Sequence, residues 1–156
     1  MNIIIEGPDA SGKSTLALFL SSFLRMPVVT SPGPVKTEEE MCNRAERYLK
    51  MDRTIFDRHP CVSEVIYGAV RGKTLIPARY LTRFDLSKKV VIYSACRFTH
   101  HNLKAHDTEE HRLMLQSKAE FIRCEYDRWA MRFADIIYRD YTDQARIHNF
   151  LKGLLP

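Results

Sequence analysis

Residues 7–15 of this chain read G-P-D-A-S-G-K-S-T and match the pattern G-x-x-x-x-G-K-[ST]. A short β-branched run, residues 2–6, precedes the match, and a segment with helical periodicity, residues 13–25, follows it. This strand–loop–helix context is the one that the pattern requires. The glycines let backbone N–H groups turn toward phosphate oxygens, and the helix N-terminus adds the positive end of a dipole. The segment therefore predicts a loop that binds nucleotide phosphates, with an ordinary glycine-rich turn as the alternative.

The residue types in and after this loop suggest ATP and Mg²⁺ as the bound groups. Lys13 places a positive charge on the β- and γ-phosphates, and the Ser14 hydroxyl can bind Mg²⁺. Asp57 ends an apolar run, where a carboxylate that orients Mg²⁺ belongs; its alternative role is to cap a helix that starts at Pro60. Arg58 can bind phosphate through two N–H groups, or form a surface ion pair. The expected nucleotide-binding residues of the loop are Gly7, Ala10, Ser11, Gly12, Lys13, Ser14 and Thr15.

Short apolar runs alternate with longer helical patterns along the chain. The expected strands cover residues 2–6, 26–30, 53–57, 89–94 and 135–138. The expected helices cover residues 13–25, 37–51, 60–69, 77–84, 108–131 and 143–154, with Thr37 as an N-cap and Glu40 at the capping-box position. This alternation predicts βαβ units and a parallel sheet covered on both faces. We expect one domain, residues 1–156, with the α/β three-layer fold of P-loop NTPases and a five-stranded sheet in the order 2-3-1-4-5. Ligands of such sheets bind beyond the carboxyl ends of the strands.

Composition narrows the class of partner and the compartment. The formal net charge of +5 suits phosphorylated small molecules or nucleic acid without choosing between them. No run of about 18 apolar residues predicts a membrane span, and the N-terminus lacks the pattern of a signal peptide. Four scattered cysteines without a C-x-x-C pair favour reduced thiols in a cytoplasmic protein. Four histidines between residues 100 and 111 read as part of a polar lid rather than as a metal site.

Residues 4–15 (I-I-E-G-P-D-A-S-G-K-S-T) resemble the opening of the thymidylate kinase family, I-E-G-x-D-x-x-G-K-S-T. Shorter segments are also similar to that family: residues 30–33 to its T-R-E-P-G-G loop, residues 43–46 to its A-N-R-x-E helix, residues 56–59 with Ser63 and Gly68 to its D-R-Y-x-x-S-x-x-A-Y-Q-G segment, and residues 123–126 to its V-R-x-x-Y helix. The resemblance implies ATP-dependent phosphorylation of a deoxynucleoside monophosphate, of the dTMP type, to the diphosphate.

The resemblance also implies roles for single residues. Asp9 contacts the sugar hydroxyl of the acceptor, Asp57 and Arg58 serve Mg²⁺ and the acceptor phosphate, and Arg44 reaches the base. The expected catalytic residues are Asp9, Lys13, Asp57 and Arg58, and the expected substrate-binding residues are Asp9, Pro32, Arg44, Arg58 and Tyr67. A basic lid closes over the phosphates in that family, and residues 97–112 occupy its place. Because Ala10 supplies no charge to the loop, Arg97, Lys104 and Arg112 are the candidate lid cations, with a solvated surface charge as the alternative for each.

The acceptor pocket departs from the family pattern. Ser31 stands where the family has a phosphate-contacting arginine, and neither Glu40 nor Met41 can stack on a base. A second hypothesis is therefore a kinase for a nucleoside, or for a modified pyrimidine of the hydroxymethyluracil type within DNA. A third is a nucleotide-binding regulatory module. The expected partners are a small nucleotide acceptor, DNA under the second hypothesis, and a second copy of the chain in a homodimer.

Overall fold

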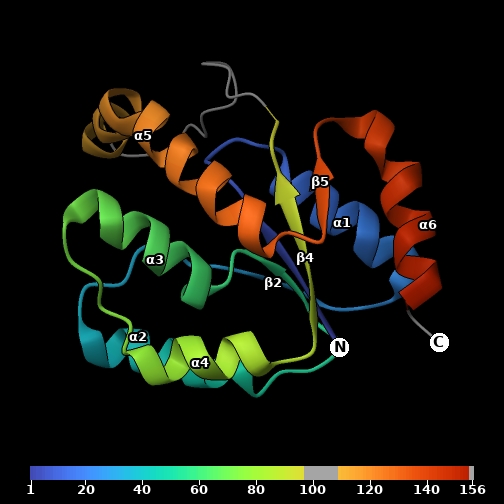
Figure 1. Cartoon of the computed structure of the whole chain (residues 1–156), viewed down its shortest axis with the longest axis horizontal. Helices are drawn as coiled ribbons and strands as arrows, with labels where there is room; N and C mark the ends of the chain where they lie inside the picture. Colours follow the sequence, from blue (N-terminus) through green and yellow to red (C-terminus); the bar gives the residue numbers. More distant parts are fainter. Residues whose placement is uncertain (97–108, 155–156) are drawn as a thin grey trace.

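The computed structural model describes residues 1–96 and 109–154, with the backbone alone for residues 109–112 and 114–116. In it one sheet contains β1 (Asn2–Glu6), β2 (Val28–Thr30), β3 (Ile55–Asp57), β4 (Lys89–Ser94) and β5 (Ile136–Tyr138). Neighbouring strands are parallel throughout, and their order is β2-β3-β1-β4-β5. The predicted fold class and strand order are therefore confirmed (Figure 1).

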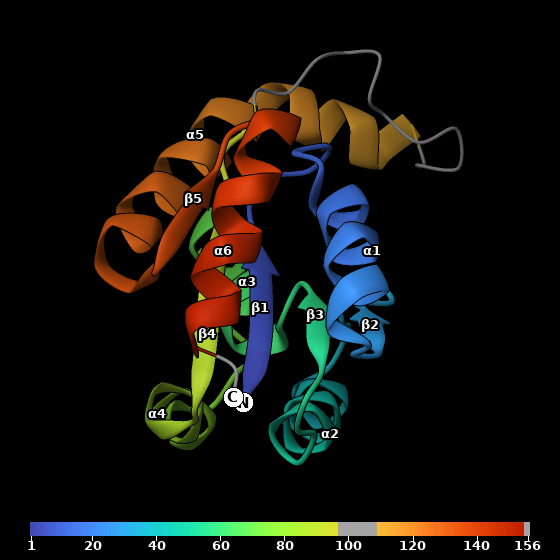
Figure 2. The same cartoon turned by 90° about the vertical axis from the view of Figure 1, so that its right-hand side faces the viewer.

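Helices cover both faces of this sheet. They are α1 (Lys13–Leu24), α2 (Glu38–Leu49), α3 (Pro60–Arg71), α4 (Ala78–Leu86), α5 (Glu109–Phe133) and α6 (Gln144–Leu154), with the short 3₁₀ turn η2 (Tyr141–Asp143) before α6. Helices α1 and α6 lie on one face, which is turned toward the viewer in Figure 2. Helices α2 to α5 lie on the other face, on the left in Figure 1. Among the described residues, no helix is long and apolar enough to cross a membrane.

The central strand β1 separates two hydrophobic cores. Ile4 points into the core beneath α2 to α5, whereas Ile3 and Ile5 point into the core beneath α1 and α6. The exposed fraction of all three side chains is 1% or less. Fully burying an isoleucine side chain contributes roughly 1.5–3 kcal/mol, so this apolar strand holds the two helical layers together. A strand buried on both faces is the reason that its sequence is continuously apolar rather than alternating.

The ends of α2 and α3 show how closely local sequence determines the helices. Thr37 caps α2 by accepting a 3.1 Å hydrogen bond from the Glu40 backbone N–H, as predicted. The Glu40 carboxylate accepts from the backbone N–H of Lys36 rather than of Thr37, so the expected capping box is displaced by one residue. Helix α3 is capped by His59, whose Nδ1 accepts from the Cys61 backbone N–H. The alternative reading of Asp57 as this cap is therefore wrong.

Strand register brings the ends of four strands to one edge of the sheet. Ile5 of β1 lies opposite Asp57 of β3, and Ser94 of β4 lies opposite Tyr138 of β5. Because all strands run in the same direction, the segments that follow them meet at this edge. The loop between β1 and α1 lies there, at the upper edge of the sheet in both views (Figures 1 and 2).

Candidate active site

The loop between β1 and α1 has a backbone that requires glycine at two positions. Gly7 has φ +153°, and a Cβ atom there would lie 2.3 Å from the Ser94 carbonyl oxygen. Gly12, the residue before α1, has φ +80°. The Ser94 hydroxyl donates a hydrogen bond to the Ser11 carbonyl oxygen, so the end of β4 fixes the loop from the other side. The glycines of the pattern are therefore explained by close approach and by left-handed backbone.

Lys13 lies folded back over this loop. Its Nζ donates to the Pro8 carbonyl oxygen and, at 3.3 Å, to the Ser11 hydroxyl. Burial, and after it the charge of Arg58, lower the pKa of Lys13 to about 7. The Lys13 side chain thus lies across the space inside the loop, where phosphate oxygens bind in loops of this pattern. An anion bound there would favour the charged form of Lys13.

Ser14 and Asp57 form the candidate metal site. The Ser14 hydroxyl donates a 2.6 Å hydrogen bond to Asp57 Oδ2, which joins the start of α1 to the end of β3. A hydroxyl and a carboxylate are hard oxygen ligands, and Mg²⁺ is usually held by one or two protein ligands together with phosphate oxygens and waters. Both residues fit Mg²⁺.

Arg58 lies beside the loop between β1 and α1 (called the phosphate loop below), and its backbone is left-handed. Its φ is +74°, a conformation that costs a residue with a side chain on the order of 1–3 kcal/mol and that clusters at functional sites. Nη2 donates to Asp9 Oδ1 at 2.7 Å and Nη1 donates to the Tyr126 hydroxyl at 2.6 Å. The exposed fraction of its side chain is 15%, so the alternative of a surface ion pair is wrong. Burial lowers the pKa of Arg58, but Tyr126, Tyr67, Asp9 and Glu6 together raise it well above the ordinary value.

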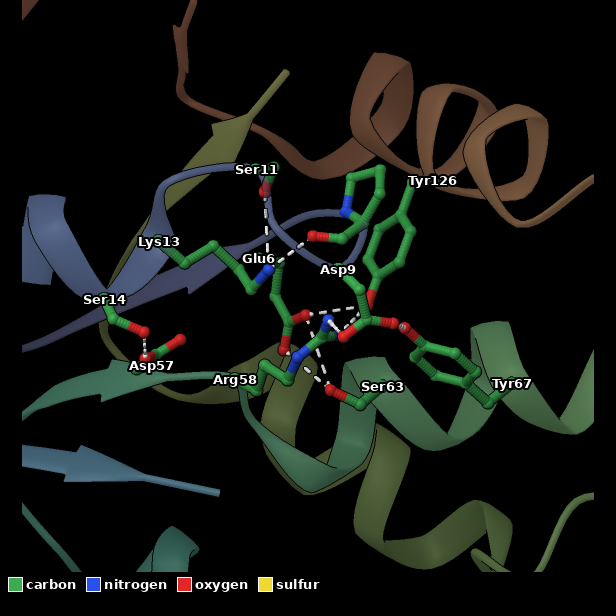
Figure 3. A network of polar contacts seen from close by, with 11 residues as sticks. Glu6, Asp9, Ser11, Lys13, Ser14, Asp57, Arg58, Ser63, Tyr67 and Tyr126 are labelled. Carbon is green, nitrogen blue, oxygen red and sulfur yellow. Dashed lines mark hydrogen bonds and ion pairs between the residues drawn. The ribbon is translucent and has the colours of Figure 1, made fainter. Parts of the chain in front are cut away.

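Glu6, which the sequence analysis did not single out, lies at the centre of this polar network (Figure 3). Its buried carboxylate accepts hydrogen bonds from the His59 backbone N–H at 2.5 Å, from Ser63 Oγ at 3.2 Å and from the Tyr126 hydroxyl at 3.2 Å. Burial raises its pKa to about 6, although the charge of Arg58 and the hydrogen bonds from His59 and Ser63 act in the opposite direction. The sequence did contain a signal for this role, because Glu6 directly follows three isoleucines of a buried strand. A charge at such a position needs a partner.

Tyr67 and Tyr126 complete the network from two different helices. Tyr67 of α3 donates a 2.6 Å hydrogen bond to Asp9 Oδ2, and its ring lies against the Arg58 guanidinium. Tyr126 of α5 is fully buried, and its hydroxyl contacts Arg58 and Glu6. Burial raises the pKa of both tyrosines, so both hydroxyls keep their protons and act as donors.

One cavity of about 1240 Å³ contains most of the residues expected from the sequence. At one end it is lined by Cys96, Tyr138, Asp140 and Tyr141, and in the middle by the phosphate loop from Asp9 to Thr15. At the other end it is lined by Pro32, Arg44, Asp57, Arg58 and Tyr67. Gly7 does not line the cavity and acts through the shape of the loop.

Two further charged residues of α3, Glu64 and Arg71, line this cavity and were not expected from the sequence. Arg44 lines it while its guanidinium donates to the Gly33 carbonyl oxygen and, at 3.0 Å, to Glu40 Oε1. Arg97 and Lys104 lie outside the described residues, as does the Arg112 side chain, so the expectation of a lid over residues 97–112 stays a prediction.

Comparison with known proteins finds relatives by structure alone. No protein-family model and no curated protein sequence matches the chain. The YorR protein from Bacillus subtilis, solved in complex with phosphorylated GDP, superposes with a TM-score of 0.68 at 22% identity, over 99% of this chain and 95% of that one. Deoxyadenosine kinase from M. mycoides with bound dATP gives 0.68 at 18% identity, over 97% of this chain and all of that one. The same enzyme with dCMP and dCDP gives 0.67 at 18% identity, over 99% and 100%. The chain therefore has the α/β P-loop NTPase fold, in the arrangement that these solved structures share.

Proposed function

We propose that the protein transfers the γ-phosphoryl group of ATP to the phosphate of a deoxynucleoside monophosphate, giving ADP and the deoxynucleoside diphosphate. The proposal rests on one observation: the phosphate loop lies in the middle of a single large cavity, with a lined end on each side. Its volume exceeds the roughly 300–1,000 Å³ of an ordinary small-molecule pocket, so donor and acceptor can be bound together. A regulatory module that binds one nucleotide needs no second binding region in the cavity.

The donor end is formed by the loop and the segment after β5. Backbone N–H groups of the loop and Lys13 suit the triphosphate, and Tyr138, Asp140 and Tyr141 lie on the side where the adenosine would extend. Ser14 and Asp57 would hold Mg²⁺, which neutralises charge on the β- and γ-phosphates when it is bound.

The acceptor end is formed by Arg58, Asp9 and Tyr67. The Arg58 guanidinium can bind the acceptor phosphate with N–H groups that its two partners leave over. Asp9, held by Arg58 and by the Tyr67 hydroxyl, presents a carboxylate that can accept from a sugar hydroxyl. These contacts position the acceptor before the reaction begins, which is the main contribution that a protein makes to phosphoryl transfer.

In the transfer step an acceptor phosphate oxygen bonds to the γ-phosphorus, and the bond from that phosphorus to the β,γ-bridging oxygen breaks. Negative charge moves onto the bridging oxygen of the leaving ADP. Lys13 lies on the loop side and Arg58 on the acceptor side, so one cation stands on each side of the transferred group. Both side chains are already fixed by hydrogen bonds, which reduces the reorganisation that the step requires.

An acceptor screen tests this proposal. The protein is incubated with ATP, Mg²⁺ and each deoxynucleoside monophosphate, and products are identified by mass. We expect one or more diphosphates, and a loss of several orders of magnitude in Lys13→Ala. Lys50→Ala, at the exposed position that follows α2, is the matched control. Parent-level turnover by Lys13→Ala would show that the loop is not the donor site.

A second candidate function is transfer to a hydroxyl, either of a free deoxynucleoside or of a modified pyrimidine in DNA. A smaller cavity of about 400 Å³, lined by Asn43 and Arg47 among others, shares Pro32 and Arg44 with the large one and leaves room for groups that flank the acceptor. The same screen therefore includes deoxynucleosides and a duplex that contains hydroxymethyluracil. Label that enters only the polymer would replace the first proposal by the second. Bound ATP without any phosphorylated product would favour the regulatory module.

A further inference from the structure

Glu64 is a buried carboxylate with one oxygen that receives no hydrogen bond from the residues that the structure describes. It lies on α3 with 4% of its side chain exposed. Its Oε1 accepts from Arg71 Nη2 at 2.5 Å and from the Leu75 backbone N–H at 2.8 Å. In the described part of the chain no residue donates to Oε2, yet Glu64 lines the large cavity. Among the described residues Oε2 is not an enclosed atom without a partner; it reaches the surface of the cavity, where a bound ligand can donate a hydrogen bond to it.

Arg71 supplies donors beside this acceptor. It lies seven residues after Glu64, on the same face of α3, and also lines the cavity. Its side chain is 39% exposed, and within the described part of the chain Nη2 is the only one of its donors that is bonded to protein. A guanidinium carries five N–H donors in a fixed plane, so Nη1 and Nε remain to donate to a ligand. The pair thus presents a free acceptor next to free donors and carries no net charge.

The position of this pair along α3 separates it from the phosphate end of the cavity. Ser63, near the start of the helix, bonds to Glu6, and Tyr67, one turn later, bonds to Asp9. Arg71 follows one more turn along the same lining face. The helix axis covers about 12 Å between residues 63 and 71. A nucleotide with its phosphate at Arg58 and its base extended along α3 would bring that base to Glu64 and Arg71.

We propose that Glu64 and Arg71 recognise the base of the acceptor, with Glu64 Oε2 accepting from a ring or exocyclic N–H and Arg71 donating to the neighbouring carbonyl oxygen or ring nitrogen. This inference rests on the proposed function and names how its acceptor is selected. A base edge presents donors and acceptors side by side without charge, which matches the pair. A phosphate does not match it, because Oε2 would repel the phosphate oxygens.

The structural role of Glu64 is carried by its other oxygen, Oε1, which binds the Leu75 backbone N–H. The segment after α3 folds back so tightly that a Cβ atom on Gly68 would lie 3.0 Å from Thr74. The bond from the Leu75 N–H to Glu64 Oε1 fixes this return. Glu64→Gln can keep that bond through its amide oxygen while it replaces Oε2 by a donor. The substitution therefore separates base recognition from the fold.

The test pairs a change in the protein with a change in the base. The best acceptor from the screen is compared with its analogue that carries a methyl group on the recognised N–H, using wild type, Glu64→Gln and Glu64→Ala. We expect methylation to lower kcat/KM of the wild type by 100-fold or more, and by less than 5-fold in Glu64→Ala. For the unmodified acceptor, Glu64→Gln raises the acceptor KM at least 10-fold, with kcat and the KM for ATP little changed. Arg71→Ala raises the same KM, and Arg71→Lys restores part of it.

Controls make the outcomes separable. Glu46→Gln, an identical change at an ion pair on the surface of α2, should alter none of these values. Circular dichroism and ATP binding report whether each variant is folded. Equal methylation effects in wild type and Glu64→Ala would overturn the role of Glu64 while leaving the kinase intact. If the wild type neither phosphorylates nor binds any member of the panel, the proposed function and this inference both fail.

Discussion

Ser14 and Asp57, 43 residues apart in sequence, are joined by a 2.6 Å hydrogen bond at the foot of the large cavity. The bond links the first turn of α1 to the last residue of β3, so the two candidate Mg²⁺ ligands are positioned before any nucleotide arrives. Asp57 is the last residue of β3 and pairs with Ile5 of the central strand. This pairing fixes the position of the Asp57 side chain relative to the loop between β1 and α1. The sheet and the start of α1 therefore bring the two candidate Mg²⁺ ligands together without a bound nucleotide.

The first prediction concerns this pair. Asp57→Asn keeps the size of the side chain but removes its charge, so we expect kcat to fall 100-fold or more and the Mg²⁺ concentration for half-maximal activity to rise. Nucleotide binding without Mg²⁺ should change little, because the loop and Lys13 are unaltered. Activity is measured across a Mg²⁺ titration, with Asp52→Asn at an exposed position as the control. An unchanged Mg²⁺ dependence would remove Asp57 from the metal site.

The second prediction uses the left-handed backbone of Arg58. Arg58→Ala and Arg58→Gly both remove the contacts to Asp9 and Tyr126, so both should lose most of their activity. Glycine adopts a φ of +74° without strain, whereas alanine does not. The glycine variant should therefore be more stable than the alanine variant, by about 1 kcal/mol in urea denaturation. Equal stabilities would mean that the backbone relaxes when the guanidinium is lost.

The third prediction concerns Gly7. A methyl group there would lie 2.3 Å from the Ser94 carbonyl oxygen, which belongs to the backbone of β4 and cannot move away easily. We expect Gly7→Ala to lower the thermal midpoint by several degrees and to abolish ATP binding in calorimetry. Gly153→Ala, in α6 with open space around it, should leave the midpoint unchanged or raise it slightly. Normal ATP affinity in Gly7→Ala would contradict the close approach described here.

The fourth prediction is a pH dependence of stability that comes from His59. Burial, and after it the charge of Lys89, lower the pKa of His59 to about 3 in the folded protein, against an ordinary value of 6.5. Between these two values the unfolded chain binds a proton that the folded protein does not, so stability falls as the pH decreases from 6.5 toward 3. Above pH 6.5 the residue contributes no pH dependence. At pH 5 the loss is on the order of 2 kcal/mol.

His59→Asn is the variant that isolates this effect, since asparagine is also a good N-cap for α3. It removes ring contacts with Phe56 and Phe84 and so lowers stability at every pH. The free energy of unfolding should nevertheless decrease less steeply than in the wild type between pH 7 and pH 5. Parallel curves for the two proteins would assign the acid sensitivity to groups other than His59.

Local sequence was enough to predict the elements and the position of the loop between β1 and α1. The phosphate loop, the cap at Thr37 and the apolar strands each depend on residues close together in the chain, and each is found where it was expected. The strand order followed as well, because the connections of parallel strands follow general rules of handedness and packing. The pairing of Asp57 with Ser14 fits the expectation of adjacent strand ends.

The partners of the buried charges were decided only by the tertiary structure. Glu6 receives hydrogen bonds from residues 53 to 120 positions away, and no periodicity in the sequence relates it to Ser63 or Tyr126. Tyr126 is fully buried, and the orientation of its hydroxyl depends on how α5 packs over the sheet. Glu64 and Arg71 were missed for the same reason: a helical sequence gives their common face, but only packing shows that this face lines a cavity. Sequence alone thus determined which residues are polar and which elements carry them, whereas the geometry that pairs their charges exists only once distant segments are packed together.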